Sequence, residues 1–341
     1  MRNCGCFWTT PVINYKGEIF PCVFHAENIN ELFLGKISES IEFLDIWKGK
    51  KIQLLREQSF NGKLDEVPSC KQCNGGYCIP FRSDIFKISD EGYFSENFIF
   101  SIPKTLFIEI SNSCNLKCIM CHNKFKNKPK FMDLNIFKSI CENLTKNNFF
   151  FENTIIHLGG ESLMHPEILK FLKIIRENKF YNYLILDTNG HFLSPLIIDE
   201  LLLIDGLFLT FSLDSCSKEV YEKIRVGGDF SKVNSNVRAF LLAASQSPKS
   251  RTIRLQFVVQ PKNEMEITPF KEFWGAYLEN LGVKYKVLVQ NREPEGHFPY
   301  QIFFKHLTGS GDGGLILGYE DIKLSESKAR LDFFKLMDEK I

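Results

Sequence analysis

Three cysteines on one short stretch have the spacing of a metal-cluster loop. Cys114, Cys118 and Cys121 form the pattern C-x3-C-x2-C and follow a strand-like run at 106–110. Three thiolates on one loop can bind three irons of a cubane 4Fe–4S cluster, whereas clusters that only carry electrons use four cysteines. The spacing therefore predicts a cluster with one iron left for another ligand. A zinc site or buried structural cysteines are the alternatives, but zinc needs a fourth ligand, and His122 lies directly beside Cys121.

The elements that must position this loop alternate between strands and helices. The expected strands are 105–111, 154–159, 182–188, 206–213, 252–260 and 283–289. The expected helices are 133–147, 166–177, 194–203, 220–225 with 231–244, and 266–279. Several of these strands are apolar nearly throughout, as in a parallel sheet covered on both faces. The pattern predicts an α/β fold, a partial (β/α)6 TIM-like barrel, with its site at the carboxyl ends of the strands.

Other candidate site residues follow the later strands. After the second strand comes Gly159-Gly160-Glu161, whose glycines allow the backbone to approach a ligand closely. Ser212 and Asp214 end the fourth strand and are two residues apart, so we expect their side chains to share one face. Cys141 and Cys216 have no cysteine neighbours and are interpreted as structural.

A second group of cysteines occupies the first 80 residues. A predicted hairpin with its turn at 14–17 should bring Cys4 or Cys6 close to Cys22, and a C-x2-C turn supplies Cys70 and Cys73. These cysteines complete a four-cysteine site for zinc or for a 4Fe–4S cluster. Cys4 and Cys6 compete for one ligand position. A helix is expected over 41–58, with a possible break at Gly49.

The cysteine motif followed by Gly-Gly-Glu resembles the radical S-adenosylmethionine (SAM) enzymes. The resemblance implies that the loop cysteines hold a SAM-binding 4Fe–4S cluster, whose electron cleaves SAM to a 5′-deoxyadenosyl radical. It also implies a set of residues that contact SAM: Met120, Gly159, Gly160, Glu161, Ser212, Asp214 and Arg225. In that family Met120 would lie beside the adenine, Glu161 near the amine and Arg225 near the carboxylate. A solvated arginine at a helix end is the alternative for Arg225.

The N-terminal cysteines resemble the SPASM/twitch modules that accompany many radical SAM enzymes. The matching features are Gly17 five residues before Cys22, and the Cys70-x2-Cys73 pair. The resemblance favours a second, auxiliary 4Fe–4S cluster over zinc. This chain departs from the family pattern because the module precedes the core and only Cys78 remains of the later cysteines. One auxiliary cluster is therefore expected, not two.

Composition narrows the class of protein. The chain has 341 residues, with 42 basic against 41 acidic side chains, which argues against binding nucleic acid through phosphate attraction. The sequence has no run of eighteen apolar residues, so no membrane span is predicted. Its eleven cysteines occur without an export signal, which favours metal ligands over disulfides and a cytoplasmic protein. The expected division is an auxiliary domain at 1–95, a core at 104–290 and a C-terminal extension at 291–341 that packs on the core.

The resemblance implies a radical oxidoreductase or maturase that abstracts hydrogen from a substrate. A peptide or protein substrate is favoured, with an electron donor such as flavodoxin or ferredoxin as partner. A dehydrogenase or epimerase of a sugar or alcohol is the first alternative, because fold does not choose the substrate. A non-catalytic iron–sulfur or zinc scaffold is the alternative from another class of protein.

Overall fold

The computed structural model describes residues 4–23, 32–38, 40–73, 103–121, 130–290 and 298–306. Within this part of the chain, no helix is both long enough and apolar enough to cross a lipid bilayer. The described residues form a mixed α/β fold with two compact units. Unit 1 holds those up to 113 and 130–184, and unit 2 holds 114–121, 185–290 and 298–306. Cys78, most of the expected boundary at 96–103 and the tail beyond 306 lie outside the described residues.

The N-terminal hairpin of unit 1 forms as predicted. β1 (Val12–Ile13) and β2 (Glu18–Phe20) pair antiparallel, and Gly17 closes the turn at φ +78°. The side-chain oxygen of Asn14 accepts the backbone N–H groups of Lys16 and Glu18, which stabilises the turn. The short strand β3 (Gly35–Lys36) extends the hairpin on its outer side.

The same hairpin continues a parallel sheet. β1 pairs parallel with β4 (Thr105–Ile108), and β4 pairs parallel with β5 (Phe151–Ile155). The strand order in this part of unit 1 is β3-β2-β1-β4-β5. The cysteine-rich segment therefore shares backbone hydrogen bonds with the first strand of the expected barrel.

The helices predicted in unit 1 at 41–58, 133–147 and 166–177 are found, whereas two short helices, at 6–9 and over the predicted C-x2-C turn, were not predicted. Their bounds are α1 Cys6–Thr9, α2 Phe43–Trp47, α3 Lys50–Phe60, α4 Pro68–Gln72, α6 Leu134–Lys146 and α7 Ile168–Asn178. The predicted break at Gly49 is confirmed, because Gly49 has an extended backbone and caps α3. Phe43 of α2 is fully buried, and its ring lies 5.2 Å from that of Phe149 and 6.2 Å from that of Phe151, before and within β5. Helix α2 thus packs against β5 and the residues before it within one unit.

Four strands of unit 2 pair in parallel with one another. β7 (Leu207–Ser212), β8 (Arg251–Val259), β10 (Tyr300–His306) and β9 (Tyr285–Val289) follow one another in that spatial order. β6 (Tyr181–Thr188) begins in unit 1 and ends in unit 2. These parallel strands confirm the predicted α/β class and are consistent with a partial barrel.

The strand β10 was not predicted from the sequence. β10 lies in the segment 291–341, which the sequence assigned to an extension that packs on the core, and it pairs with β8 on one side and β9 on the other. Its Phe303 lies 4.0 Å from the Arg254 guanidinium of β8, and its Phe304 is fully buried. The extension from residue 291 therefore contributes an interior strand.

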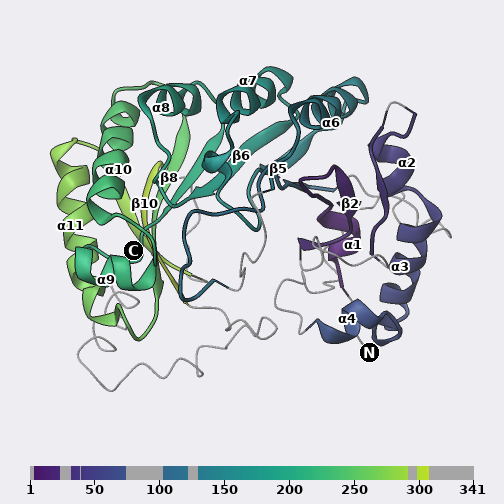
Figure 1. The fold of residues 1–341 in the computed structure, drawn as a ribbon, viewed down its shortest axis with the longest axis horizontal. Coiled ribbons are helices and arrows are strands. Elements are labelled where there is room, and N and C mark those ends of the chain that lie inside the picture. Colours follow the sequence, from purple (N-terminus) through teal and green to yellow (C-terminus); the bar gives the residue numbers. More distant parts are fainter. Residues whose placement is uncertain are drawn as a thin grey trace. The chain divides into compact units, whose positions relative to one another are not determined.

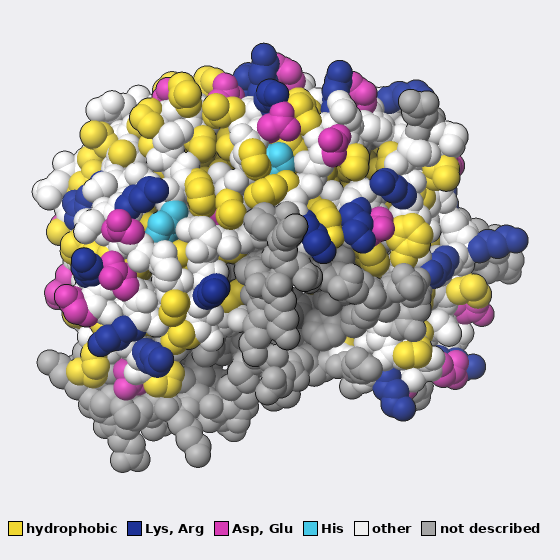
Figure 2. Space-filling model, viewed as in Figure 1, with side chains coloured by type: hydrophobic (Ala, Val, Ile, Leu, Met, Phe, Trp, Pro, Cys, Tyr) yellow, Lys and Arg dark blue, Asp and Glu magenta, His cyan; other side chains and the backbone are white. Residues whose placement is uncertain are grey.

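Helices cover the strands of unit 2. Their bounds are α8 Pro195–Leu202, α9 Lys218–Ile224, α10 Phe230–Ser245 and α11 Ile267–Asn280. α10 and α11 lie along the outer side of β8 and β10 (Figure 1). Ring contacts join strands to helices, at 5.3 Å between Phe211 and Phe240 and at 4.9 Å between Phe257 and Phe270. Basic and acidic side chains are interspersed on the face in Figure 2, in keeping with the net charge of +1.

Candidate functional site

The cysteine loop of unit 2 is held by a backbone ladder. The N–H of Lys117 donates to the carbonyl of Val226 at 2.8 Å, and the N–H of Ile119 donates to the carbonyl of Ile224 at 3.0 Å. These bonds flank Cys118 on one side and Arg225 on the other, so the two residues lie opposite each other. Cys114, Cys118 and Cys121 are all half-buried. The loop is thereby fixed without belonging to a strand.

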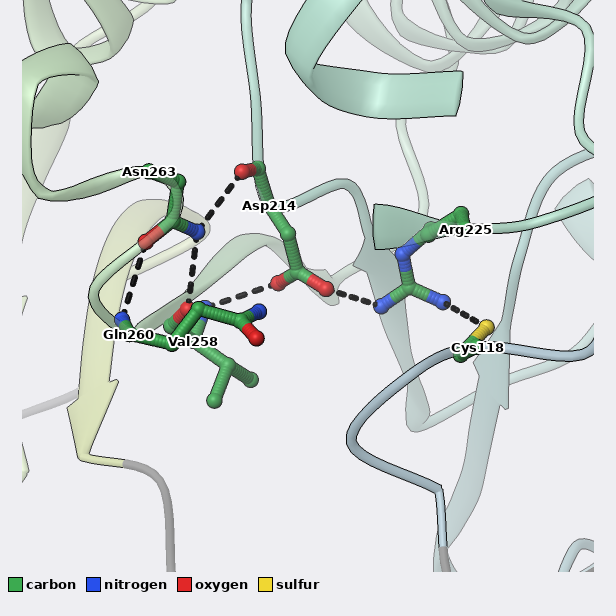
Figure 3. A network of polar contacts seen from close by, with 6 residues as sticks. All are labelled: Cys118, Asp214, Arg225, Val258, Gln260 and Asn263. Carbon is green, nitrogen blue, oxygen red and sulfur yellow. Dashed lines mark hydrogen bonds and ion pairs between the residues drawn. The ribbon is translucent and has the colours of Figure 1, made fainter. Parts of the chain in front are cut away.

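Arg225 joins this loop to the end of β7. Its Nη2 lies 2.6 Å from Asp214 Oδ2, and its Nη1 lies 3.7 Å from Cys118 Sγ (Figure 3). Arg225 is 7% exposed and Asp214 is fully buried. The solvated arginine considered from the sequence is therefore wrong. Arg225 Nε has no hydrogen-bond partner among the described residues.

Asp214 takes up this position because the chain turns sharply after β7. It has φ +62°, a left-handed backbone that Asp tolerates better than most residues. Its Oδ1 accepts the Val258 N–H at 2.7 Å, so a side chain satisfies a β8 backbone donor just beyond the β7–β8 ladder. The amide of Asn263 donates to the carbonyls of Asp214 and Val258, each at 2.9 Å (Figure 3).

This geometry changes the expected relation between Ser212 and Asp214. Ser212 is the last residue of β7 and is half-buried, whereas Asp214 lies past the strand end and is fully buried. The alternation of side chains along a strand therefore does not place the two on one face. Both Asp214 oxygens accept hydrogen bonds from protein groups, from Arg225 and from Val258.

A second network of hydrogen bonds reaches Cys114, the first cysteine of the motif. Asn189 Nδ2 lies 2.9 Å from Asn115 Oδ1 and 3.8 Å from Cys114 Sγ. Asn189 Oδ1 lies 2.9 Å from His191 Nδ1, and His191 Nε2 accepts the Asp229 N–H at 2.9 Å. Because Nε2 is the acceptor, neutral His191 carries its proton on Nδ1 and donates it to Asn189. Burial lowers the pKa of His191, which favours this neutral form.

Burial and neighbouring charges shift the pKa of Arg225, and that of Cys118, in opposite directions. Burial lowers the pKa of the Arg225 guanidinium, but Asp214 and Cys118 more than reverse this effect, so its pKa lies above the ordinary value. Burial raises the pKa of the Cys118 thiol above 9.0, and the positive charge of Arg225 opposes that rise. The site thus presents a permanent cation to a half-buried sulfur.

The Gly-Gly-Glu turn packs against the residues just before the cysteine motif. A Cβ on Gly160 would lie 2.5 Å from Ser111 O, Ser113 N and Ser113 O, so no larger residue fits there without backbone movement. The Glu161 N–H donates to Ser113 O at 2.8 Å, and Gly159 N–H donates to Glu109 Oε1 at 3.2 Å. This turn therefore holds Ser113, the last residue before Cys114 in the sequence, in place within unit 1.

Glu161 itself is 3% exposed, and its Oε1 accepts the Leu163 N–H at the start of a short 3-10 helix at Ser162–Met164. Glu109, Asn189 and His191 were not assigned as site residues from the sequence. A charged residue within the apolar run 106–110 was the available signal for Glu109, which is fully buried. Asn189 lies in the stretch 187–190, which composition predicts as a turn and which the family resemblance places near the methionine end of SAM, and neither prediction singled out Asn189.

The N-terminal cysteines all lie in unit 1. The Cys4 N–H donates to Ser59 Oγ at 2.8 Å, and that hydroxyl donates back to Cys4 O at 3.0 Å, which ties Cys4 to α3. Cys6 begins α1, Cys70 lies on α4, and Cys73 caps the end of α4. Cys4 and Cys6 are both buried, as is Cys22, so the choice between Cys4 and Cys6 stays open.

The donor set of the loop fits an iron–sulfur cluster. Three thiols lie within eight residues, and N–H groups of Arg225, Asn189 and Leu116 lie near two of the sulfurs, as is usual around cluster thiolates. In the part of the chain that is described, no three His, Cys, Asp or Glu side chains converge on a single metal ion. A cubane does not need such convergence, since each of its cysteines binds a different iron. Met120 is half-buried on the same loop.

Comparison with protein families places two domains on this chain. The model of the radical SAM superfamily matches residues 108–243, which include the cysteine loop, the Gly-Gly-Glu turn and Arg225. The model of the SPASM iron–sulfur cluster-binding domain matches residues 4–74. The SPASM module thus precedes the core, as the sequence indicated.

Individual relatives are more distant. A probable GTP 3',8-cyclase of Methanocaldococcus jannaschii is 28% identical over 182 residues, covering 52% of this chain and 57% of the relative. A tungsten-containing aldehyde ferredoxin oxidoreductase cofactor-modifying protein of Pyrococcus furiosus is 28% identical over 199 residues, covering 56% and 52%. The chain therefore spans little more than half of either relative. Streptococcus suis SuiB bound to its precursor peptide SuiA is 12% identical, with a TM-score of 0.43 over 89% of this chain and 72% of that chain.

Proposed function

Because this chain carries a radical SAM domain preceded by an SPASM domain, we propose that it cleaves SAM reductively and abstracts hydrogen from a peptide or protein substrate. The cofactors of these two domains are a 4Fe–4S cluster with SAM and an auxiliary iron–sulfur cluster. When bound, the first cluster and SAM supply the 5′-deoxyadenosyl radical. The observation that carries the proposal is the loop of Cys114, Cys118 and Cys121, with protein N–H groups near two of its sulfurs.

In this proposal the chain's own residues bind and orient the cofactors. Cys114, Cys118 and Cys121 are the cluster ligands, and the ladder to 224–226 keeps them in place. The backbone turn of Gly159 and Gly160 and the buried carboxylate of Glu161 are the contacts for the amine of SAM. A buried carboxylate attracts an ammonium group strongly, because little water competes with it.

Arg225, Asp214, Ser212 and Met120 complete the proposed SAM contacts. The unpartnered Nε of Arg225 is the donor available to the SAM carboxylate, while Asp214 holds the guanidinium in place through Nη2. Ser212 offers a half-buried hydroxyl at the carboxyl end of β7, and Met120 offers an apolar side chain beside the cysteines.

The auxiliary module is proposed to use Cys22, Cys70 and Cys73 with either Cys4 or Cys6. A four-cysteine site of this kind can take up an electron from the substrate radical, which would make the overall change an oxidation. It can also orient the substrate. The proposed domain limits remain 1–95 for this module, 104–290 for the core and 291–341 for the C-terminal segment, whose strand β10 pairs with the core strands.

Anaerobic reconstitution with iron and sulfide tests the proposal. We expect about eight irons per chain, four for each cluster, and release of 5′-deoxyadenosine when dithionite and SAM are added. Replacing any of Cys114, Cys118 or Cys121 by Ala should abolish that release. Cys141→Ala is the matched control, because Cys141 is fully buried in α6 and burial raises the pKa of its thiol. Absence of 5′-deoxyadenosine from the fully loaded protein would support the non-catalytic scaffold instead.

A small-molecule substrate is the second candidate. It is favoured by the names of the two curated relatives given above, which refer to GTP and to the cofactor of an aldehyde ferredoxin oxidoreductase. A sugar or alcohol belongs to the same class of substrate. The two candidates can be separated by adding an extract of the source cells, with its proteins and peptides retained, and measuring 5′-deoxyadenosine above the substrate-free level. Stimulation that is lost after protease treatment of the extract supports a peptide. Stimulation that survives protease supports a small molecule.

A further inference from the structure

The contact between Arg225 and Cys118 is rigid on both sides. The backbone bonds of Lys117 and Ile119 to Val226 and Ile224 set the distance between the two chain segments. The guanidinium is fixed from behind, because Asp214 accepts Nη2 at 2.6 Å and is itself held by the Val258 N–H at 2.7 Å. Arg225 cannot leave Cys118 without breaking a buried ion pair.

The Asp214 carboxylate, the Arg225 guanidinium and the Cys118 sulfur follow one another in that order. Arg225 lies between the Asp214 carboxylate and the Cys118 sulfur, so the cationic edge faces the sulfur and the anion lies on the far side (Figure 3). The planar guanidinium can donate to two acceptors at once, which a lysine ammonium on a flexible stem does less well. The sulfur therefore faces a charged donor with fixed geometry.

Cys114 offers an internal comparison on the same loop. Its sulfur lies 3.8 Å from Asn189 Nδ2, close to the 3.7 Å between Cys118 Sγ and Arg225 Nη1. Asn189 is also fixed, through Asn115 and His191. Asn189 and Arg225 thus differ mainly in charge, since their distances to the two sulfurs are similar and both side chains are held by other hydrogen bonds.

We propose that Arg225 is a positioning residue that acts through Cys118 to raise the reduction potential of the SAM-binding cluster. This inference rests on the proposed function, in which Cys114, Cys118 and Cys121 hold that cluster. Reduction adds one electron from an external protein donor or from dithionite, and the thiolate-bound cluster becomes more negative by one charge. Hydrogen bonds from charged donors to cluster sulfurs stabilise the more negative state and are a known determinant of cluster potentials.

The test is a redox titration of the full-length, reconstituted protein, followed by electron paramagnetic resonance in the absence of SAM. A separate sample with SAM identifies which signal belongs to the SAM-binding cluster, because only that signal changes. For Arg225→Gln we expect the ratio of reduced to oxidised cluster at a fixed potential to fall about tenfold, which is about 59 mV for a one-electron couple. For Asn189→Ala we expect a smaller fall, since the lost donor is neutral.

Two further variants make the result specific. Arg225→Lys keeps the charge but loses the fork that reaches Cys118 and Asp214 together, so its potential should fall measurably, but by less than that of Arg225→Gln. Arg238→Gln removes another arginine of unit 2, whose guanidinium lies 4.2 Å from the Tyr277 ring, and should leave the potential unchanged. An equal shift in Arg238→Gln would mean a general charge effect and overturn the inference.

The outcomes separate this inference from the proposed function. If wild-type protein takes up no SAM-sensitive cluster, the proposed function fails. If Arg225→Gln has full iron content and a native circular dichroism spectrum but an unchanged potential, the proposed function stands and the inference is wrong. If Arg225→Gln does not fold, Arg225→Lys decides, and an unchanged potential in that variant also overturns the inference.

Discussion

Asp214 Oδ2 and Arg225 Nη2 lie 2.6 Å apart, with the carboxylate fully buried and the arginine side chain 8% exposed. Removing one partner of such a pair leaves a buried charge without compensation, which destabilises a protein by about 3–5 kcal/mol. We expect Asp214→Ala to lower the free energy of unfolding by that amount. The double variant Asp214→Ala/Arg225→Met should be less destabilised than Asp214→Ala alone, as measured by urea unfolding of the metal-free protein. A double variant that is worse than either single change would contradict this account.

Gly160 allows the close approach of two loops. In Gly160→Ala the new Cβ would lie 2.5 Å from three backbone atoms, so Ser111–Ser113 or the Gly-Gly-Glu turn must move. We expect destabilisation of about 1–3 kcal/mol and a loss of SAM cleavage. Gly282→Ala is the control, because Gly282 has φ +68° but nothing within 4 Å, so only backbone strain of about 1 kcal/mol applies. Equal effects of the two variants on SAM cleavage would contradict a role for close approach.

The auxiliary site can be tested by metal content. The double variant Cys70→Ala/Cys73→Ala removes the C-x2-C pair at the end of α4 and should lose about four of about eight irons. The SAM-sensitive paramagnetic signal should remain, since the loop at 114–121 is unchanged. Wild-type protein with about four irons and one zinc would instead assign a zinc site to the N-terminal module.

His165 predicts a weakening of unit 1 in mild acid. Its Nδ1 accepts the Glu167 N–H at 3.0 Å and its Nε2 lies 2.9 Å from Met132 O, which fits a neutral ring that donates from Nε2. Burial lowers the pKa of His165 below its ordinary value of 6.5. Below pH 6.5 the unfolded chain therefore binds a proton that the folded protein does not, and stability falls with falling pH down to the folded pKa. The slope is at most about 1.4 kcal/mol per pH unit.

In His165→Gln this contribution should disappear. Urea unfolding midpoints of the metal-free protein between pH 5 and 8 would give a flatter profile for the variant than for the wild type. A wild-type profile without any loss below pH 6.5 would argue against a neutral, buried His165.

Phe304 tests whether β10 belongs to the core. Its ring is fully buried, 5.5 Å from Phe257 of β8 and 6.1 Å from Phe270 of α11. Phe304→Ala should lower the free energy of unfolding by about 3–5 kcal/mol, because a large buried ring is lost. Phe150, which is 53% exposed, provides the matched control, and Phe150→Ala should change stability by less than about 0.5 kcal/mol. A small effect at Phe304 would support a loosely attached tail.

Local signals in the sequence were sufficient for most helices. Asp133 caps α6 by accepting the N–H groups of Asn135 and Ile136, and the predicted range 133–147 matches α6 within one residue at each end. Ser194 caps α8 in the same manner, ahead of Pro195. Caps and apolar periodicity are properties of neighbouring residues, so they can be recognised without knowing the fold.

Non-local pairing limited the prediction of strands. β5 was expected at 154–159 and is found at Phe151–Ile155, because the apolar run into Leu158 continued past the point where the chain leaves the ladder. β10 was assigned to the tail, since the neighbours that make it a strand are β8 and β9. Strand preference depends on such neighbours more than on the residues of the strand itself.

The candidate site was predictable in its cysteines but not in its supporting contacts. The spacing of Cys114, Cys118 and Cys121 is a local pattern. The contact of Arg225 with Cys118 depends on a ladder between segments about a hundred residues apart and on the left-handed backbone of Asp214. Neither the ladder nor the left-handed backbone of Asp214 can be predicted from the periodicity of the sequence.

The parallel pairing of β1 with β4 has a consequence for any attempt to produce the catalytic part alone. A fragment that starts after residue 103 would lack Val12 and Ile13, and β4 would then expose a row of unsatisfied N–H and C=O groups along its side. Such an unpaired edge strand can pair with strands of other copies of the chain and promote aggregation. The cysteine-rich segment would thus protect the solubility of its neighbour, whether or not it carries iron.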